Sequence, residues 1–138
     1  GRENEPCRGR LIVMMNHIDG LDPVLVTIAL SRDIDIMSKI ENLQAPVLGP
    51  LTRWFGGFPI RRHELDLSAI RQAVKVLESE RALLMAPEGT RSKNASLQSA
   101  YDGMALIAAR TNTPVLPVAI WGDEAHPHRR AVSLGLQR

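Results

Sequence analysis

The segment Leu11-Ile12-Val13-Met14-Met15-Asn16-His17-Ile18-Asp19-Gly20-Leu21-Asp22-Pro23 decides the fold class of this chain. Its first five residues are continuously apolar, which is typical of a strand buried inside a sheet. Asp19-Gly20 is a strong turn signal. Asp22-Pro23 predicts the start of a helix, with Asp22 as the N-cap and proline in the first turn. A strand, a tight turn and a helix in this order favour an α/β fold.

The rest of the chain continues this alternation of apolar strands and amphipathic helices. The clearest helix is predicted from Leu67, Ile70, Val74 and Leu77, whose spacing places them on one apolar stripe that we expect to face the core. The remaining patterns predict strands at residues 34–37, 58–61, 82–86, 115–121 and 131–136, and helices at residues 22–31, 46–55 and 100–110. We therefore expect a single α/β domain over residues 1–138, with a central, mostly parallel or mixed sheet flanked by helices.

Composition limits the function classes that fit. Of the 138 residues, 44% are apolar, which is enough for a packed core and too many for a disordered chain. The net charge is only +2 and aromatic residues are 4%, so no nucleic-acid partner is expected. Cys7 is the one cysteine, and it suits a reducing compartment because it has no partner for an intrachain disulfide.

His17 and Asp22 form the first candidate site. A histidine paired with a carboxylate can act as a general base, because the carboxylate fixes the tautomer and stabilises the imidazolium. Five positions apart on one unbroken helix would place the two side chains about 140° apart around its axis. The turn at Asp19-Gly20 could instead fold His17 back toward Asp22. The alternative is that Asp22 serves only as an N-cap and His17 only as a turn residue.

Two further loops carry groups that bind anions. Residues 87–92, Pro-Glu-Gly-Thr-Arg-Ser, directly follow an expected strand, and their hydroxyl and guanidinium groups can bind a phosphate or an oxyanion. Residues 56–62, Gly-Gly-Phe-Pro-Ile-Arg-Arg, combine two glycines that let a backbone approach a ligand with arginines that suit phosphate. The alternatives are a solvated loop with a local ion pair for the first segment and a turn into an edge strand for the second.

Taken together and in order, these segments strongly resemble the lysophosphatidic acid (1-acylglycerol-3-phosphate) acyltransferase family. That family carries four blocks, and this chain matches them with Asn16-His17 through Asp22, Gly57 to Arg62, Pro87 to Ser92, and the strand Val115 to Ile120. The resemblance covers most of the chain. One departure is Ala86, which stands where the family usually has phenylalanine.

The resemblance implies a role for each matching residue. His17 would be the general base for the acceptor hydroxyl, and Asp22 would orient it. Arg62, with Arg61 beside it, would hold the acceptor phosphate. The residues of the third block that would bind the glycerol phosphate of the acceptor are Glu88, Gly89, Thr90 and Arg91.

The implied activity is transfer of a fatty acyl group from acyl-CoA or acyl carrier protein to the hydroxyl of a lysophospholipid, with 1-acylglycerol-3-phosphate as the expected acceptor. No cofactor or metal is required. The family also implies a membrane surface as partner and a location at the cytoplasmic face of a membrane, and residues 1–138 would be its catalytic domain without the N-terminal helices that help dock the membrane. Two other hypotheses stay open: a thioester hydrolase that uses the same pair, and a non-catalytic lipid-binding module.

Two other segments have simpler interpretations. His126-Pro127-His128 alternates histidines, but no cysteine or carboxylate cluster completes a metal site there, so we expect an exposed loop. Trp54 and Phe55 form an apolar patch that we expect to pack into the core. Contact with lipid or with a membrane interface is the alternative for this pair.

Overall fold

The computed structural model describes residues 2–46, 48–61, 66–92, 96–122 and 130–134. The strands are β1 (Leu11–Met15), β2 (Ile34–Lys39), β3 (Phe58–Ile60), β4 (Ala82–Met85), β5 (Val115–Gly122) and β6 (Arg130–Leu134). The helices are a short 3-10 helix (Arg2–Asn4), α1 (Asp22–Ala29), α2 (Ile40–Gln44), α3 (Leu48–Trp54), α4 (Leu67–Glu78) and α5 (Gly103–Thr111).

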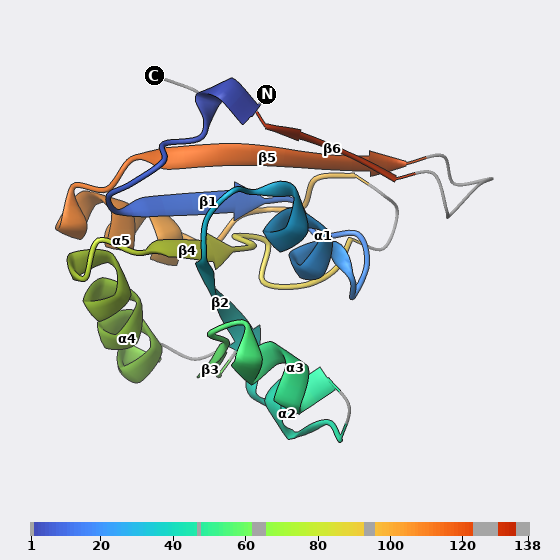
Figure 1. The fold of residues 1–138 in the computed structure, drawn as a ribbon. Coiled ribbons are helices and arrows are strands. Elements are labelled where there is room, and N and C mark those ends of the chain that lie inside the picture. The colour runs from blue at the N-terminus through green and yellow to red at the C-terminus, as the bar shows by residue number, and fades with distance from the viewer. Residues whose placement is uncertain (1, 47, 62–65, 93–95, 123–129, 135–138) are drawn as a thin grey trace.

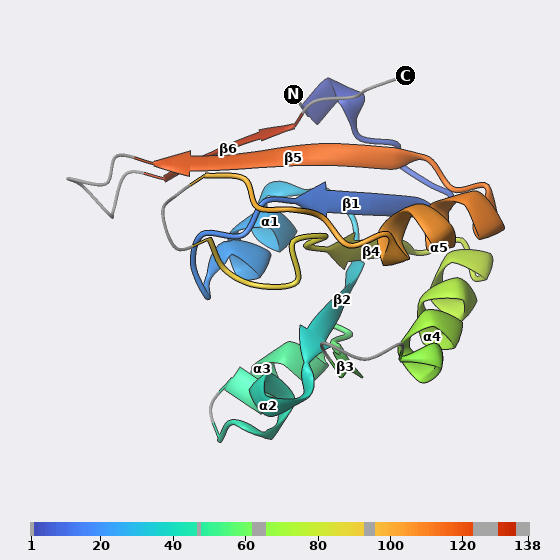
Figure 2. The ribbon, with the colours of Figure 1, turned by 180° about the vertical axis from the view of Figure 1, so that it is seen from behind.

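The strands form one sheet in the order β3-β2-β4-β1-β5-β6. The first five run parallel, and β6 pairs antiparallel with β5 at the edge. Helix α1 packs on one face of the sheet, and α4 and α5 pack on the other (Figures 1 and 2). This arrangement confirms the expected α/β fold with a mixed, mostly parallel sheet flanked by helices.

The two central strands explain why the apolar runs are continuous. Strands β1 and β4 lie inside the sheet with helices on both sides, so alternate residues of each strand enter two different cores. Val13 packs toward α1, whereas Ile12 packs toward α4 and α5, and both are fully buried. The carboxyl ends of the parallel strands share one edge of the sheet, which is where open α/β folds place their ligands.

Helix α4 differs from the sequence prediction in the face that it buries. Its most buried residues include Ala69 and Ala73, together with Leu77 of the predicted stripe, whereas Leu67 is 55% exposed. Ala73 packs in the core with Ile12 and Leu83 of the sheet, where a small side chain lets the helix approach closely, and the buried Ala69 lines a cavity. The larger Ile70 is only partly buried, because it packs at the margin of this core and also lines a cavity.

The segment between β2 and β3 also departs from the prediction. The helix expected over residues 46–55 is present as α3, but the structure adds a short helix that was not expected, α2, which begins at Ile40 directly after β2. These helices project away from the sheet beyond β2 (Figures 1 and 2). Phe55 packs against the core as expected, whereas Trp54 is 79% exposed, so core packing was wrong for that residue.

Candidate active site

Asn16 fixes the end of β1. Its side-chain oxygen accepts the N–H of Ile120 at 2.7 Å, and its side-chain nitrogen donates to the carbonyl of Ile120 at 2.8 Å. This pair of bonds continues the attachment of β1 to β5 by one residue beyond Met15. The next residue, His17, therefore leaves the sheet from a fixed position. No role for Asn16 could be predicted from the sequence, because a side chain that replaces a backbone hydrogen-bond partner gives no periodic signal.

His17 and Asp22 meet, as the turn between them predicts. The His17 Nδ1 lies 3.2 Å from the Asp22 Oδ2, and the same oxygen accepts the N–H groups of Ile18 and Asp19, both at 2.6 Å. Asp22 is fully buried, and His17 keeps 12% of its side chain exposed. The turn is therefore wrapped around one carboxylate.

Asp22 is the first residue of α1, and Leu21 occupies the N-cap position without a side-chain bond to the helix. The expected N-cap role of Asp22 is therefore wrong. The physical reason is that its carboxylate turns back toward the imidazole and the preceding loop, where it has three donors. The simpler alternative, in which Asp22 acted only as a cap, fails for the same reason.

The charge of Asp22 is set by two opposing effects. Burial raises the pKa of its carboxyl group, but hydrogen bonds from His17, Asp19 and Ile18 outweigh it and hold that pKa below the ordinary value of 3.8. Asp22 is thus an anion at neutral pH. An anion beside Nδ1 favours the tautomer with its proton on Nδ1, which leaves the lone pair of Nε2 available to take a proton.

The loop that follows β4 is tied to His17. The Glu88 side chain is 4% exposed, and its Oε1 accepts the N–H of His17 at 3.3 Å while its Oε2 accepts the N–H of Gln98 at 2.9 Å. The N–H of Ser92 donates to the carbonyl of His17 at 2.7 Å. The third sequence block therefore contacts the first one directly, although 71 residues separate His17 from Glu88.

Gly89 and Tyr101 pack against each other beside this loop. Gly89 has φ of +65°, and a Cβ at this position would lie 2.8 Å from the Tyr101 ring. The N–H of Tyr101 donates to the carbonyl of Pro87 at 2.9 Å, which holds the ring over the loop. Tyr101 could not be predicted as part of the site, because it lies outside every motif and is separated from Gly89 in the chain.

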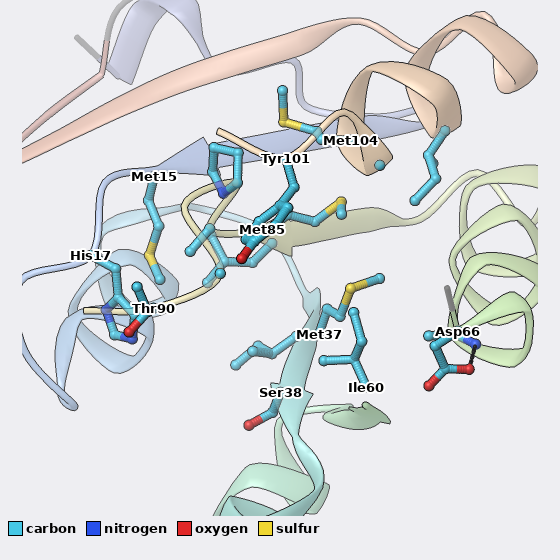
Figure 3. Close-up of a pocket in the computed structure, with 18 of the residues that line it drawn as sticks. Met15, His17, Met37, Ser38, Ile60, Asp66, Met85, Thr90, Tyr101 and Met104 are labelled. Atoms are coloured by element: carbon cyan, nitrogen blue, oxygen red, sulfur yellow. Dashed lines mark hydrogen bonds between the residues drawn. The ribbon is translucent and has the colours of Figure 1, made fainter. Parts of the chain in front are cut away.

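A cavity of about 480 Å³ opens at the carboxyl edge of the parallel strands. His17 and Thr90 lie together at one side of it, and Asp66 lies on the opposite side beside α4 (Figure 3). The wall between them is mainly apolar and includes Met15, Met37, Met85, Met104, Ile36, Ile60, Ile70, Leu84 and Ile107. The imidazole therefore stands at the border of a space that suits a hydrocarbon chain.

The arginines predicted to bind phosphate differ in how they are placed relative to the cavity. Arg61 is exposed and lines the cavity just after β3, and its N–H donates to Asp66 Oδ2 at 2.9 Å. Arg91 is exposed beside Thr90. Arg62, the other predicted phosphate ligand, lies outside the described residues, as do His126 and His128. Within the described part of the chain, no cluster of three histidine, cysteine or carboxylate side chains could hold a metal.

The family model of acyltransferases matches residues 1–121. This chain belongs to the acyltransferase family. The family predicted from the four sequence blocks is thereby confirmed. No helix among the described residues of this acyltransferase-family chain has both the length and the apolar character to span a bilayer.

Two relatives with similar sequences are named as 1-acyl-sn-glycerol-3-phosphate acyltransferases. A 1-acyl-sn-glycerol-3-phosphate acyltransferase of Streptococcus pneumoniae is 33% identical over 113 residues, which is 80% of this chain and 41% of that protein. One of Borreliella burgdorferi is 28% identical over 123 residues, which is 88% of this chain and 49% of that protein. The chain thus spans about half, or less, of the length of these acyltransferases.

A solved structure shares the fold. The crystal structure of the 1-acyl-sn-glycerophosphate (LPA) acyltransferase PlsC from Thermotoga maritima matches with a TM-score of 0.80 and 26% sequence identity. The match covers 99% of this chain and 58% of that chain. The acyltransferase fold described above is therefore similar to this structure over nearly its whole extent.

Proposed function

We propose that this chain transfers a fatty acyl group from a thioester donor to the hydroxyl of 1-acylglycerol-3-phosphate, with His17 as general base and Asp22 as its orienting partner. The observation that carries the proposal is the position of this pair. The Nδ1 of His17 is held by a buried anion, while the ring lines an apolar cavity beside a loop rich in anion-binding groups. The names of the relatives support the same acceptor.

The reaction follows from the protonation state of the pair. The Nε2 of His17 takes the proton of the acceptor hydroxyl as its oxygen attacks the thioester carbonyl. The carbonyl oxygen becomes an oxyanion in the tetrahedral intermediate, and collapse of that intermediate forms the ester and breaks the C–S bond. The thiolate then leaves with the proton from the imidazolium. The Asp22 anion stabilises that imidazolium while it exists. The reaction as written needs no metal and no cofactor.

Each part of the substrates is assigned to the part of the site whose chemical character suits it. The acyl chain takes the methionine-lined cavity, because a flexible thioether wall accommodates hydrocarbon well. The acceptor phosphate takes Arg61, the hydroxyl of Thr90 and the backbone of Gly89, which line the cavity. Arg91 and Arg62, which are next to Thr90 and Arg61 in the sequence, are assigned to the same phosphate. The donor is acyl-CoA or acyl carrier protein, since both present the same thioester.

A membrane surface is the proposed source of the acceptor, and the cytoplasmic face is the proposed side, since the single thiol of Cys7 suits a reducing compartment. Support comes from α3, which projects from the sheet and ends in the exposed Trp54 beside the exposed Arg53 (Figure 1). Tryptophan favours the membrane interface, and arginine favours anionic lipid. Sedimentation with anionic vesicles should fall for Trp54→Ala, and equal sedimentation of both proteins would contradict this surface.

The test of the reaction is direct product detection by mass spectrometry. Purified protein is given a long-chain acyl-CoA and a panel of lysolipids, with His17→Ala alongside. We expect a diacyl product that depends on the acceptor and that falls by about 10²-fold or more without the base. Undiminished transfer by His17→Ala would reject the mechanism. Free fatty acid formed without dependence on an acceptor would favour a thioester hydrolase.

A further inference from the structure

Glu88 faces a different direction from its neighbours in the third sequence block. Pro87, Gly89 and Thr90 all line the cavity, whereas Glu88 does not belong to its wall. Its side chain is 4% exposed and points into the protein between two loops. A substrate in the cavity therefore meets the residues on either side of Glu88, and not its carboxylate.

Both carboxylate oxygens of Glu88 already serve the protein itself. Oε1 accepts the N–H of His17, and Oε2 accepts the N–H of Gln98. A buried carboxylate requires such donors, because burial of a charge without hydrogen-bond partners is strongly unfavourable. The main chain of His17 is held a second time through its carbonyl, which accepts the N–H of Ser92.

We infer that Glu88 is a positioning residue for the catalytic histidine and not a ligand of the acceptor. Its carboxylate joins the loop that carries the base to the loop that carries Gly89 and Thr90. The base and the phosphate-binding groups consequently keep one relative position. This inference rests on the proposed function, since it assigns Glu88 to the same reaction.

The requirement for such a brace follows from proton transfer. A base must lie within about 0.5 Å of its productive position, and a displacement of about 1 Å can cost on the order of 10²-fold in rate. Asp22 fixes the ring of His17 through Nδ1, but it does not hold the main-chain N–H of that residue. Glu88 supplies that restraint from another part of the chain.

Glu88→Gln is the informative substitution, because the amide keeps the size of the side chain but presents one acceptor and one donor to two N–H groups. We expect kcat to fall by roughly tenfold while KM for 1-acylglycerol-3-phosphate stays within about twofold. Glu88→Asp, which keeps both acceptors, should lose less. Glu78→Gln, on the exposed side of α4, is the matched control and should leave both constants unchanged.

The second readout does not depend on turnover. This readout is the NMR spectrum of protein isotopically labelled at its four histidines, in which His17→Ala identifies the ring signals of His17. Glu88→Gln should shift these signals and leave those of the other three histidines in place. If the wild-type protein formed no diacyl product with any acceptor, the proposed function would fail, and this displacement would still test the positioning role.

Three outcomes would overturn the inference. A rise in KM for the acceptor with kcat retained would make Glu88 a substrate ligand. Unchanged His17 signals together with unchanged kcat would leave it without a positioning role. A lower melting temperature with normal kcat would make it a purely structural residue. Should Glu88→Gln not fold, the kinetic constants, the His17 signals and the melting temperature of Glu88→Asp decide the matter.

Discussion

The two ends of the cavity are built in opposite ways. At the histidine end, His17 lines the cavity and is held from behind by Asp22 and Glu88, buried carboxylates that accept several backbone N–H groups. The arginine end, formed by Arg61 and Asp66, is held by one loop bond and a helix cap, and Arg61 is exposed. A base acts over hydrogen-bond distance and must be placed accurately, whereas a cation attracts a phosphate over a longer range and tolerates motion.

The largest expected effect lies at the histidine end. In Asp22→Asn the side chain loses its charge, so it no longer favours the tautomer that leaves Nε2 free. We expect kcat for acyl transfer to fall by roughly 10³-fold, within the range of general-base catalysis. Asp33→Asn, at an exposed carboxylate before β2, is the control. Steady-state kinetics would check this, and a change only in KM would contradict the contrast between the ends.

Arg61→Ala tests the arginine end. Loss of one charged contact to phosphate should raise KM for the acceptor by about tenfold and leave kcat within about twofold. We expect a moderate effect because the proposed function assigns the same phosphate to other groups as well. Arg71→Ala, on the exposed side of α4, should change neither constant. A large loss of kcat in Arg61→Ala would show that both ends take part in the chemical step.

The smallest expected effect is on stability at the arginine end. Hydrogen bonds from the backbone N–H groups of Arg61, Ala69 and Ser68 hold the pKa of Asp66 below its ordinary value of 3.8. Asp66→Ala removes this cap of α4 and should lower the free energy of unfolding by about 1 kcal/mol at neutral pH. Asp102→Ala is the matched control, because Asp102 occupies the N-cap position of α5 without a side-chain cap bond.

The same variant carries a pH dependence of known sign. A carboxylate with a lowered folded-state pKa contributes stability above its unfolded pKa and loses it as pH falls through the folded pKa. The charge of Asp66 should therefore make a constant contribution to the difference in unfolding free energy between wild type and Asp66→Ala above pH 3.8, the ordinary value. Below that pH the difference should shrink. Urea unfolding at several pH values would measure this, and a difference that grew on acidification would contradict the assigned charge.

Sequence could predict the parts of this molecule that local chemistry determines. The run 11–15 and the turn at Asp19-Gly20 predicted β1 and the contact between His17 and Asp22, because apolar continuity and turn residues act within a few positions. The exposure of Trp54 and the buried face of α4 could not be read this way. Both depend on which elements the sheet places beside them.

The direction of Glu88 and the packing of Tyr101 on Gly89 were missed for a related reason. A motif names residue types in order, but it does not say which of two neighbours faces the cavity. Asn16 illustrates the same limit, since its partner Ile120 lies 104 residues away. The catalytic roles assigned to His17 and Asp22 remain a proposal, whereas their contact is part of the structure.

The anchorage of His17 has a consequence for how activity should be interpreted. Its surroundings come from three distant stretches of the chain: the turn that ends at Asp22, the loop with Glu88 and Ser92, and the strand that contains Ile120. Until β1, β4 and β5 have assembled, the histidine is an ordinary imidazole in water. In the proposed reaction, catalysis would therefore require the assembled sheet, and specific activity would report the fraction of fully folded molecules.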